Sequence, residues 1–431
     1  MCRTFVSMRC DLFEKYSQLL QEDKLAFSVA IITFLFPLGM ASIRSWAAIG
    51  FYLIVLLCLL ALRRTKGEMI QGQKWLIWAI LVFIASVFLS FINADDLANG
   101  YKRLGKVAPI LLLIPVVSGL RRLPMLSIKA FMPGVVVGGG VMTAIALYST
   151  MIQGKARAMG YYHPIIFGDL AIVIAAILTC LVLSGLLSGV YRWLVPAVIP
   201  FAIMASLLSQ SRGGWFAIPA VAVLITVLHV SRFNKLKLLA TILCFIAVIV
   251  LSPIIFPGTI GKQFDRTTQS IEQFTSGEKQ NTSIGTRFLL WDIALQVWQE
   301  HPIIGSGIGD FRHDSQQYID SEKTNLRRPW HHAHSVYFEY LSMTGLLGFT
   351  AMMFALLLAP FGIFYRYWRL SESPEEKFNS LSGMAIVLCF AVFGLSEAWL
   401  ARSAFVSSYL LMLGIFLSSI GRSGSTECLK G

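Results

Sequence analysis

Long apolar runs separated by short polar stretches dominate this chain of 431 residues. A helix needs about 17–25 residues to cross the hydrocarbon core of a bilayer. Because lipid offers the backbone no hydrogen-bond partners, each run is expected to be an α-helix. The expected spans are residues 26–43, 46–62, 75–92, 107–120, 130–152, 165–190, 193–210, 214–230, 238–256, 340–365, 379–396 and 404–420. The pattern predicts an all-α, polytopic membrane protein with about 12 transmembrane helices.

A long polar stretch, residues 257–333, separates the ninth expected span from the tenth. Within it, apolar side chains recur at helical spacing on one face, before Pro302: Leu290, Ile293, Ala294 and Val297. We therefore expect a large helical loop that caps the bundle. The expected organisation is an N-terminal segment (1–25), nine spans (26–256), the cap loop (257–333), three spans (334–420) and a tail (421–431).

Composition supports a membrane location, since 56% of the residues are hydrophobic and only 14% are charged. So few ionisable groups cannot cover a water-facing surface. The short loops on the side of the N-terminus carry more Lys and Arg than those on the other side, and such loops are typically cytoplasmic. The sequence thus predicts a multi-pass membrane protein with both termini cytoplasmic and the cap loop on the opposite, periplasmic side. The first apolar run, from Ala26, is expected to be an uncleaved signal anchor.

Two classes of chemistry find no support in the sequence. None of the seven cysteines lies in the cap loop, so neither an extracellular disulfide nor a cysteine metal site is indicated there. There is no phosphate-binding loop of the G-x-x-x-x-G-K-[ST] type, so ATP is not expected to supply energy. We expect no cofactor, no metal and no nucleic-acid partner.

Three histidines stand in the segment from Trp330 to Tyr340, where the cap loop re-enters the membrane: His331, His332 and His334. The unperturbed pKa of imidazole suits proton transfer near neutral pH, which makes His334 a candidate catalytic base. Two other interpretations stay open. The cluster could be a set of polar rings at the interface, or His331 and His334 could bind zinc, although no further ligand stands at a typical spacing.

Two arginines are the other catalytic candidates. Arg212 lies between two apolar runs with almost no loop, and a cation at that depth is costly unless it meets an anion. Arg287 opens the amphipathic segment of the cap, where the helix dipole opposes a cation, so a phosphate is a natural partner. The alternatives are a snorkelling arginine at position 212 and a solvated surface arginine at position 287.

Further outer-face groups are candidates for binding phosphate or sugar. Together with two histidines of the cluster, His331 and His332, they are Lys102, Arg103, Arg157, Tyr161, His163 and Trp291. We also expect Glu397 and Arg402 to form a pair on this face, and Asp169 to pair with one of its cations.

Several of these residues lie in motifs that resemble those of the O-antigen ligase family. His334-Ser335, nine residues and Gly345-Leu-Leu-Gly348 are similar to its H-[NSQ]-x9-G-x-x-G signature, with Phe349 in place of the usual small or β-branched residue. His301-Pro-Ile-Ile-Gly-Ser-Gly307 resembles its H-P-hydrophobic-hydrophobic-G-x-G segment. Ser211-Arg-Gly-Gly-Trp215 and Thr286-Arg-Phe288 stand where the family carries arginines. With the expected spans and loop, the resemblance covers most of the chain.

The resemblance implies a metal-independent glycosyltransferase that inverts the anomeric centre. Its donor would be an O-antigen linked to undecaprenyl pyrophosphate, and its acceptor a sugar hydroxyl of the lipid A core. His334 would accept the proton of that hydroxyl, while Arg212 and Arg287 would neutralise the departing pyrophosphate. The alternatives are an O-antigen polymerase, an O-linked oligosaccharyltransferase and, from another class, a transporter, for which inverted repeats would be expected.

Overall fold

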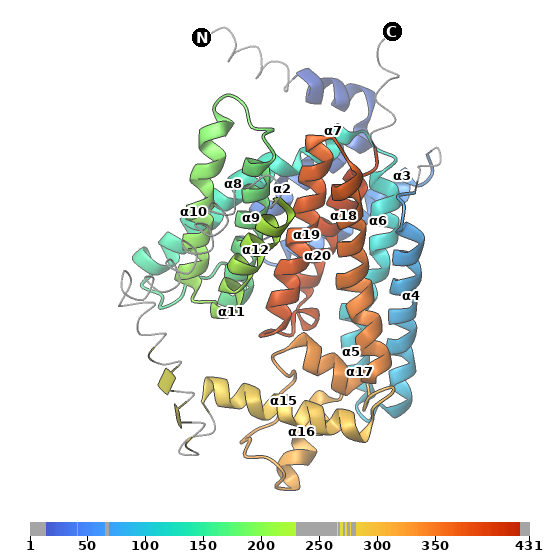
Figure 1. Ribbon diagram of the computed structural model, residues 1–431, viewed down its shortest axis with the longest axis vertical. Helices are drawn as coiled ribbons and strands as arrows, with labels where there is room; N and C mark the ends of the chain where they lie inside the picture. Colours follow the sequence, from blue (N-terminus) through green and yellow to red (C-terminus); the bar gives the residue numbers. More distant parts are fainter. Residues whose placement is uncertain are drawn as a thin grey trace.

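A computed structural model describes residues 14–40, 42–64, 69–229, 265, 268–269, 272–273, 276 and 282–422. Within these ranges every element given below is a helix (Figure 1). They are α2 (Lys24–Gly39), α3 (Trp46–Ala61), α4 (Gln73–Ser90), η1 (Phe91–Asn93), α5 (Leu97–Val107), η2 (Ala108–Leu112), α6 (Leu113–Leu120), α7 (Met125–Lys129), α8 (Phe131–Leu147), η3 (Tyr148–Ile152), α9 (Pro164–Leu183), α10 (Tyr191–Ser209), α11 (Arg212–Trp215), α12 (Ala217–His229), α15 (Ser283–Glu300), α16 (Phe311–Asp320), α17 (Val336–Met353), η5 (Phe354–Leu358), α18 (Ala359–Leu370), α19 (Pro374–Gly394), η6 (Trp399–Ala401) and α20 (Ser403–Ser419).

Seven helical segments in the described part of the chain are long and apolar enough to cross a membrane. They are Gln73–Asn93, Leu97–Leu120, Met125–Ile152, Pro164–Leu183, Tyr191–Ser209, Val336–Leu370 and Pro374–Gly394. Shorter apolar helices cover Lys24–Gly39, Trp46–Ala61, Arg212–Leu228 and Ser403–Ser419. The expected ninth span, residues 238–256, lies outside the described residues. The protein is therefore an all-helical, multi-pass membrane protein. The total of about twelve transmembrane helices stays a prediction.

The fourth expected span begins earlier than the hydropathy pattern indicates. The structure starts this segment at Leu97 rather than at residue 107. Asp96 caps its first turn by accepting the Asn99 backbone N–H at 3.0 Å, as a helix N-cap does. Lys102 and Arg103 consequently lie on a helix that runs into the span and not in a loop.

Small residues let the helices of the bundle approach closely. On α8, a Cβ at Gly134 would lie 2.2 Å from the Phe34 carbonyl oxygen of α2. One at Gly138 would lie 2.8 Å from the Pro37 carbonyl oxygen. Close backbone contact through glycine is typical of helices that pack within a membrane. The glycines of α8 thus hold α2 and α8 together.

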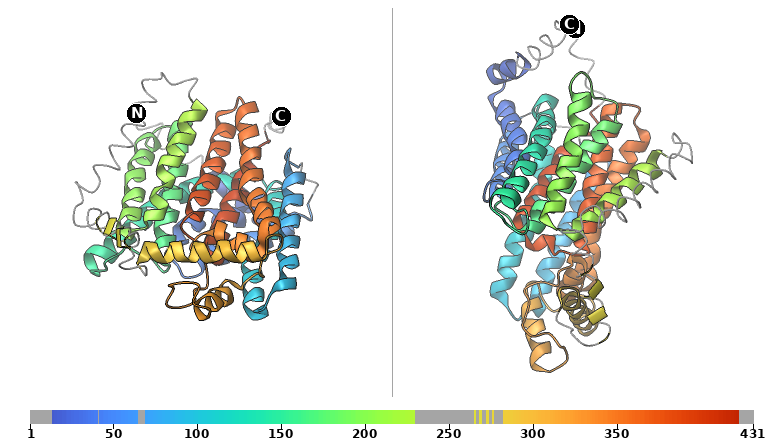
Figure 2. Two further views of the ribbon diagram at one scale, coloured as in Figure 1. Left: turned by 60° about the horizontal axis from the view of Figure 1, so that its bottom comes forward. Right: turned by 90° about the vertical axis from the view of Figure 1, so that its left-hand side faces the viewer.

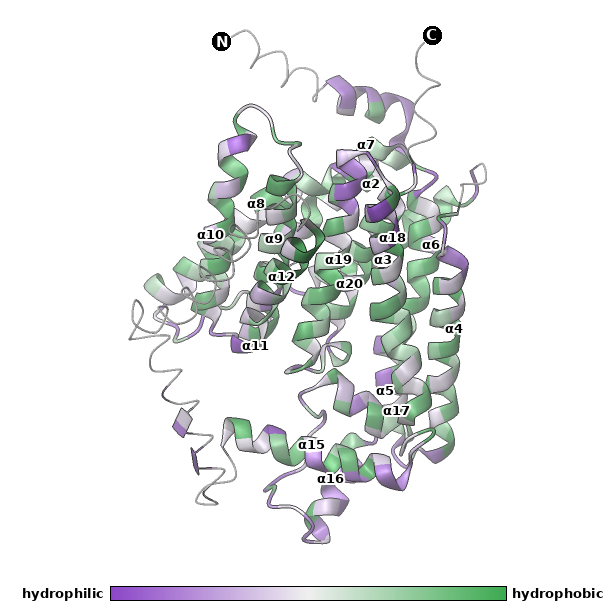
Figure 3. Ribbon diagram, viewed as in Figure 1, coloured by the Kyte–Doolittle hydropathy of each residue, from purple (hydrophilic) through white to green (hydrophobic). Residues whose placement is uncertain are grey.

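Helix α15 lies across one end of the bundle, transverse to the long helices (Figures 1 and 2). The amphipathic face expected from the sequence is confirmed, because all four of its apolar residues are fully or almost fully buried. The helix ends at Glu300, two residues before Pro302. Figure 3 shows green, hydrophobic helices along most of the bundle, a mixture of green and purple residues along α15, and more purple, hydrophilic residues at α16.

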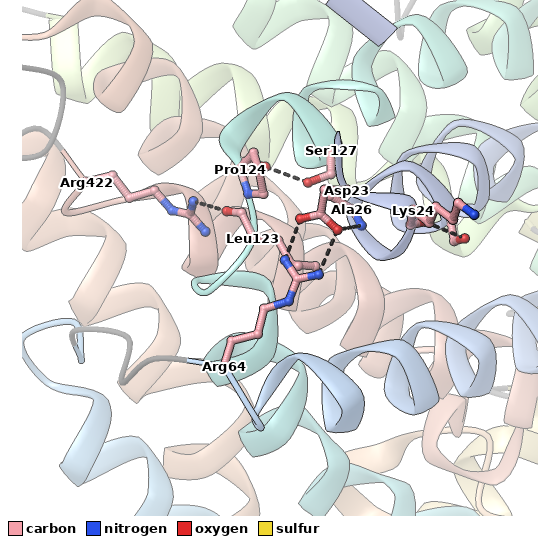
Figure 4. A network of polar contacts seen from close by, with 9 residues as sticks. Asp23, Lys24, Ala26, Arg64, Leu123, Pro124, Ser127 and Arg422 are labelled. Atoms are coloured by element: carbon pink, nitrogen blue, oxygen red, sulfur yellow. Dashed lines mark hydrogen bonds and ion pairs between the residues drawn. The ribbon is translucent and has the colours of Figure 1, made fainter. Parts of the chain in front are cut away.

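The opposite end of the bundle is tied together by arginines (Figure 4). Arg64, after α3, forms a two-pronged ion pair with Asp23, the N-cap of α2, with one hydrogen bond of 2.7 Å. Arg422, after α20, donates to the carbonyl oxygens of Leu123 at 2.9 Å and Leu120 at 2.7 Å. The start of α2 and the ends of α3, α6 and α20 therefore meet at this end.

Candidate functional site

Two glycine-bearing segments, residues 302–307 and 342–347, pair through their backbones. Ser306 and Gly307 donate to the carbonyls of Ser342 and Met343 at 3.0 and 3.1 Å, and Leu346 and Leu347 donate to those of Pro302 and Ile303 at 2.9 and 3.1 Å. Helix α17 is interrupted at Gly345, which has a φ of 61°. A Cβ there would lie 2.3 Å from the Ile303 carbonyl. Only glycine combines this backbone angle with so close an approach.

The cap segment is also fastened to the start of α5. Asp310 accepts the backbone N–H groups of Asp95 at 2.6 Å and Asp96 at 2.9 Å. The Asn93 side chain donates to the Gly305 carbonyl at 2.8 Å. Elements far apart in the sequence thus form one rigid platform under the segment that precedes α17.

The histidine loop, residues 330–335, is held on this platform at several points. The Trp291 indole of α15 donates to the Ala333 carbonyl at 3.1 Å, and its ring stacks on Phe338 with centroids 5.0 Å apart. Arg103 donates to the His331 carbonyl at 2.5 Å. The Ser335 hydroxyl donates to the Gly394 carbonyl of α19 at 3.0 Å. Three separate helices therefore determine where the imidazoles of this loop lie.

His334 is the residue that this loop presents in a strained conformation. Its φ is 55°, an angle that residues other than glycine rarely adopt and that often marks a functional position. Its ring lies 4.4 Å from that of His332 and 5.2 Å from that of Trp330, centroid to centroid. The surrounding contacts impose this conformation, which directs the imidazole toward the end of α19.

Glu397 is the acid that faces His334. Its Oε2 lies 3.9 Å from Nδ1 of His334, and its Oε1 accepts from Nε of Arg402 at 3.3 Å. Glu397 is 2% exposed, and both Nδ1 of His334 and Oε2 of Glu397 are buried without a hydrogen bond among the described residues. The expected pairing of Glu397 with Arg402 is confirmed. Two buried polar atoms face each other just beyond hydrogen-bonding distance.

The imidazoles of His332 and His334 are neutral at pH 7. Burial, followed by the charges of Arg287, Arg402 and His163, lowers the pKa of His334 to about 4. Burial and the neighbouring His334 lower the pKa of His332 to about 2. A neutral imidazole can accept a proton, as a general base must.

Arg287 lies within electrostatic reach of both His334 and Glu397. Burial lowers its pKa, and the negative charge of Glu397 opposes that shift. The guanidinium nevertheless stays charged at any ordinary pH. A partly buried cation near one carboxylate and the neutral imidazole of His334 has capacity for a further anion.

Arg212 opens the short helix α11, which is pressed against α9 and the end of α19. The hydroxyl of Ser211 donates to Asp169 at 2.6 Å. A Cβ at Gly213 would lie 2.0 Å from the Ser396 hydroxyl oxygen, one residue before Glu397. Among the described residues, the partner of Asp169 is thus a hydroxyl and not a cation as expected. Arg212 therefore stands on a segment that is wedged beside the residues around Glu397.

The remaining predicted residues divide into anchored and exposed groups. Arg157 donates to the carbonyls of Ser209 and Gln210 at 2.9 and 3.3 Å, which satisfies the end of α10. Arg103 forms a buried ion pair of 2.7 Å with Glu339. The exposed group comprises Lys102, Tyr161, His163 and His331.

The sequence did not connect Glu397 with His334, because 63 positions separate them. In the sequence, the one feature that pointed to Glu397 was the nearby Arg402. Within the part of the chain that the structure describes, no group of three or more His, Cys, Asp or Glu side chains could hold a metal ion. The site as built brings together one strained histidine, a buried carboxylate and several cations, which suits proton transfer beside an anion.

Comparison with known proteins relates these residues to one family. The family model described as O-antigen ligase matches residues 197–353, which contain Arg212, Arg287 and His334. The chain is also 26% identical over 396 residues to an uncharacterized protein of Haemophilus influenzae, across 90% of this chain and 96% of the relative. The resemblance noted in the motifs is confirmed.

Proposed function

We propose, on the premise that the chain carries an O-antigen ligase domain over residues 197–353, that it is the ligase that completes lipopolysaccharide. It would transfer an O-antigen polysaccharide from undecaprenyl pyrophosphate to a sugar hydroxyl of the lipid A core. The reaction would take place at the periplasmic face of the bacterial inner membrane. The observation that carries the proposal is a strained, neutral His334 beside buried Glu397 in a field of cations.

In the proposed reaction, the acceptor hydroxyl oxygen attacks the anomeric carbon of the donor sugar. The new glycosidic bond forms as the bond to the pyrophosphate oxygen breaks. The hydroxyl proton passes to Nε2 of His334, since Nδ1 lies on the side of Glu397. Glu397 orients the imidazole and stabilises its protonated form, as a carboxylate behind a catalytic histidine does. The negative charge leaves with the lipid pyrophosphate.

The leaving group needs positive charge in the place where its own charge increases. Arg287 and Arg212 fulfil this role in the proposal, with guanidinium groups that match phosphate oxygens in bidentate geometry. Trp291, His331 and His332 shape the site around them. The cations that serve as anchors, Arg103 and Arg157, hold the histidine loop and the end of α10 instead.

Donor binding would also adjust the base. In the free protein burial and, after it, the charges of Arg287 and Arg402 lower the pKa of His334. A pyrophosphate that neutralises these cations raises that pKa toward the ordinary value of about 6.5. The imidazole therefore becomes a stronger base when the donor is in place. The cations that would bind the donor would thus also keep His334 a weak base until the donor is bound.

The topology in this proposal has both termini in the cytoplasm and residues 257–333 as a periplasmic cap. The arginine-tied end shown in Figure 4 is the cytoplasmic face, in agreement with the greater number of Lys and Arg in its loops. Both substrates are lipid-anchored, so they would reach the site from the bilayer beneath the cap. Holding both reduces the reaction to aligning a hydroxyl with an anomeric carbon.

The decisive test is transfer by the purified full chain with EDTA present. It offers lipid-pyrophosphate-linked O-antigen with either lipid A core or a second lipid-linked repeat as acceptor. We expect transfer to the core alone, unaffected by EDTA. Elongation of the lipid-linked repeat would indicate a polymerase, transfer to an added protein acceptor an oligosaccharyltransferase, and loss of activity in EDTA a metal-dependent reaction. Passage of the lipid-linked glycan across vesicles without any transfer would indicate a transporter.

A further inference from the structure

A cavity of about 310 Å³ lies at the end of the bundle far from the histidine loop. It is formed by α7, α8 and the distal ends of α9, α19 and α20, whose other ends reach the candidate site. Its volume is within the range of about 300–1,000 Å³ that is usual for small-molecule sites. The proposed glycosyl transfer makes no use of it.

The wall of the cavity is mostly apolar, and of its two uncharged polar side chains Ser419 is bound to the Ile415 carbonyl. Most of its lining is contributed by aliphatic, thioether and aromatic side chains, among them Ile128, Met132, Phe378 and Phe416. Asn379 also lines it, is 6% exposed and makes no hydrogen bond with any residue that the structure describes. A buried amide without a partner is costly, so a ligand that accepts a hydrogen bond here is favoured.

A pair of opposite charges stands at the rim. Nζ of Lys129 lies 2.9 and 3.1 Å from the carboxylate oxygens of Glu375, and both side chains are about half exposed. Exposed pairs of this kind contribute little to stability, so their charges remain available to a ligand. The guanidinium groups of Arg121, Arg122 and Arg422, at the same end of the bundle, are bound to backbone carbonyls, so Lys129 is the cation among the residues that line the cavity.

We propose that this cavity binds an anionic phospholipid. One acyl chain occupies the apolar interior, an ester oxygen of the glycerol accepts from the Asn379 amide, and the phosphate lies at Lys129. The apolar wall favours an acyl chain, the Asn379 amide favours a hydrogen-bond acceptor, and Lys129 favours a negative headgroup. The site would couple the enzyme to the composition of the leaflet opposite the one in which it acts.

The first test fills the cavity and leaves the rim intact. Met132→Trp on α8 inserts a ring into it, whereas Val137→Trp makes a comparable change on an exposed face of the same helix. The full chain in detergent is titrated with phosphatidylglycerol, and bound lipid is counted by native mass spectrometry. We expect one tightly bound lipid in wild type and in Val137→Trp, and at least about tenfold weaker binding in Met132→Trp. Equal binding in all three overturns the proposal.

The second test changes the headgroup interaction in both directions and needs no altered packing. Lys129→Gln should weaken phosphatidylglycerol binding about fivefold, while Glu375→Gln, which removes the competing carboxylate, should strengthen it by a similar factor. Asn379→Leu, of similar volume, should weaken it too. Phosphatidylcholine, measured in parallel, should bind less and respond to neither charge variant. Equal binding of the two lipids, or no response to either charge change, overturns the anionic site.

Discussion

The two ends of the bundle use the same residue type in opposite ways. At the end shown in Figure 4, the guanidinium groups of Arg64 and Arg422 are bound by a carboxylate and by backbone carbonyls. At the histidine end, Arg287 lies near the neutral imidazole of His334 and the carboxylate of Glu397, and Nδ1 of His334 and Oε2 of Glu397 make no hydrogen bond among the described residues. The arginines of the first end have their partners within the protein. The site at the histidine end keeps polar atoms and positive charge that a ligand can engage.

The contrast shows that an arginine is a poor indicator of function until its partners are known. Arg103 and Arg157 lie at the histidine end, yet their guanidinium groups bind carbonyls of the histidine loop and of α10. They position the site, whereas Arg287 supplies its charge. The predictions that follow test this division, from the largest expected effect to the smallest.

Replacing His334 should have the largest effect. We expect His334→Ala to lower kcat by about 10²–10⁴-fold, the usual contribution of a general base. His334→Gln, which keeps a polar side chain, should not restore it. Transfer by purified protein measures the loss, and an unchanged melting temperature in detergent shows that the fold is intact. Retention of full activity by either variant would refute the role of base.

Removing the charge of Arg287 should rank second. Arg287→Ala is expected to lower kcat by about 10²–10³-fold, as loss of one group that stabilises a developing charge does. Arg327→Ala removes an exposed arginine from the same cap and should leave kcat unchanged. Arg212→Ala, assayed with the same lipid-pyrophosphate donor, should resemble Arg287→Ala. Equal rates for Arg287→Ala and Arg327→Ala would contradict the assignment.

Glu397 should have a smaller effect, because it acts through His334. We expect Glu397→Gln to lower kcat by about 10–100-fold, the usual loss when an outer partner that orients a histidine is removed. Glu397→Asp should restore part of the rate, since it keeps the charge. A purely structural role would instead lower the melting temperature of Glu397→Gln and leave kcat of the folded fraction unchanged.

The pH dependence should show the effect of donor binding on His334. The base must be neutral, so activity is present above its pKa and is lost as the pH falls through it. In the free protein that pKa is about 4, and kcat/KM should therefore fall only as the pH approaches this value. The acid limb of kcat, which reports the complex, should lie at higher pH. Coincident limbs would show that the donor does not neutralise the surrounding cations.

The arginine-tied end should affect stability alone. Arg422→Ala removes charged hydrogen bonds to the carbonyls of Ser418, Leu120 and Leu123 and should cost about 1.5–3 kcal/mol for the strongest of them. We expect a lower melting temperature and an unchanged kcat per folded molecule. A loss of kcat without loss of stability would mean that the two ends do not differ as described.

Much of the fold follows from the sequence, because lipid leaves the backbone few choices. Eleven of the twelve expected spans coincide with helices, and the buried face of α15 was correctly derived from Leu290 and its neighbours. The start of the fourth span was wrong, since hydropathy misses a polar first turn capped by Asp96. The motif around Gly345 was visible as a spacing, but its pairing with residues 302–307 was not.

The sequence by itself determined the helices, the membrane location and the residue types able to carry the chemistry, since these depend on local hydropathy and side-chain pKa. Only the tertiary structure decided which of them act together. It placed Glu397 beside His334 across 63 positions and bound Arg103 and Arg157 to carbonyls. The reason is that the pKa of an ionisable group, and its availability to a ligand, depend on the groups around it. Helix packing brings those groups together from distant parts of the chain.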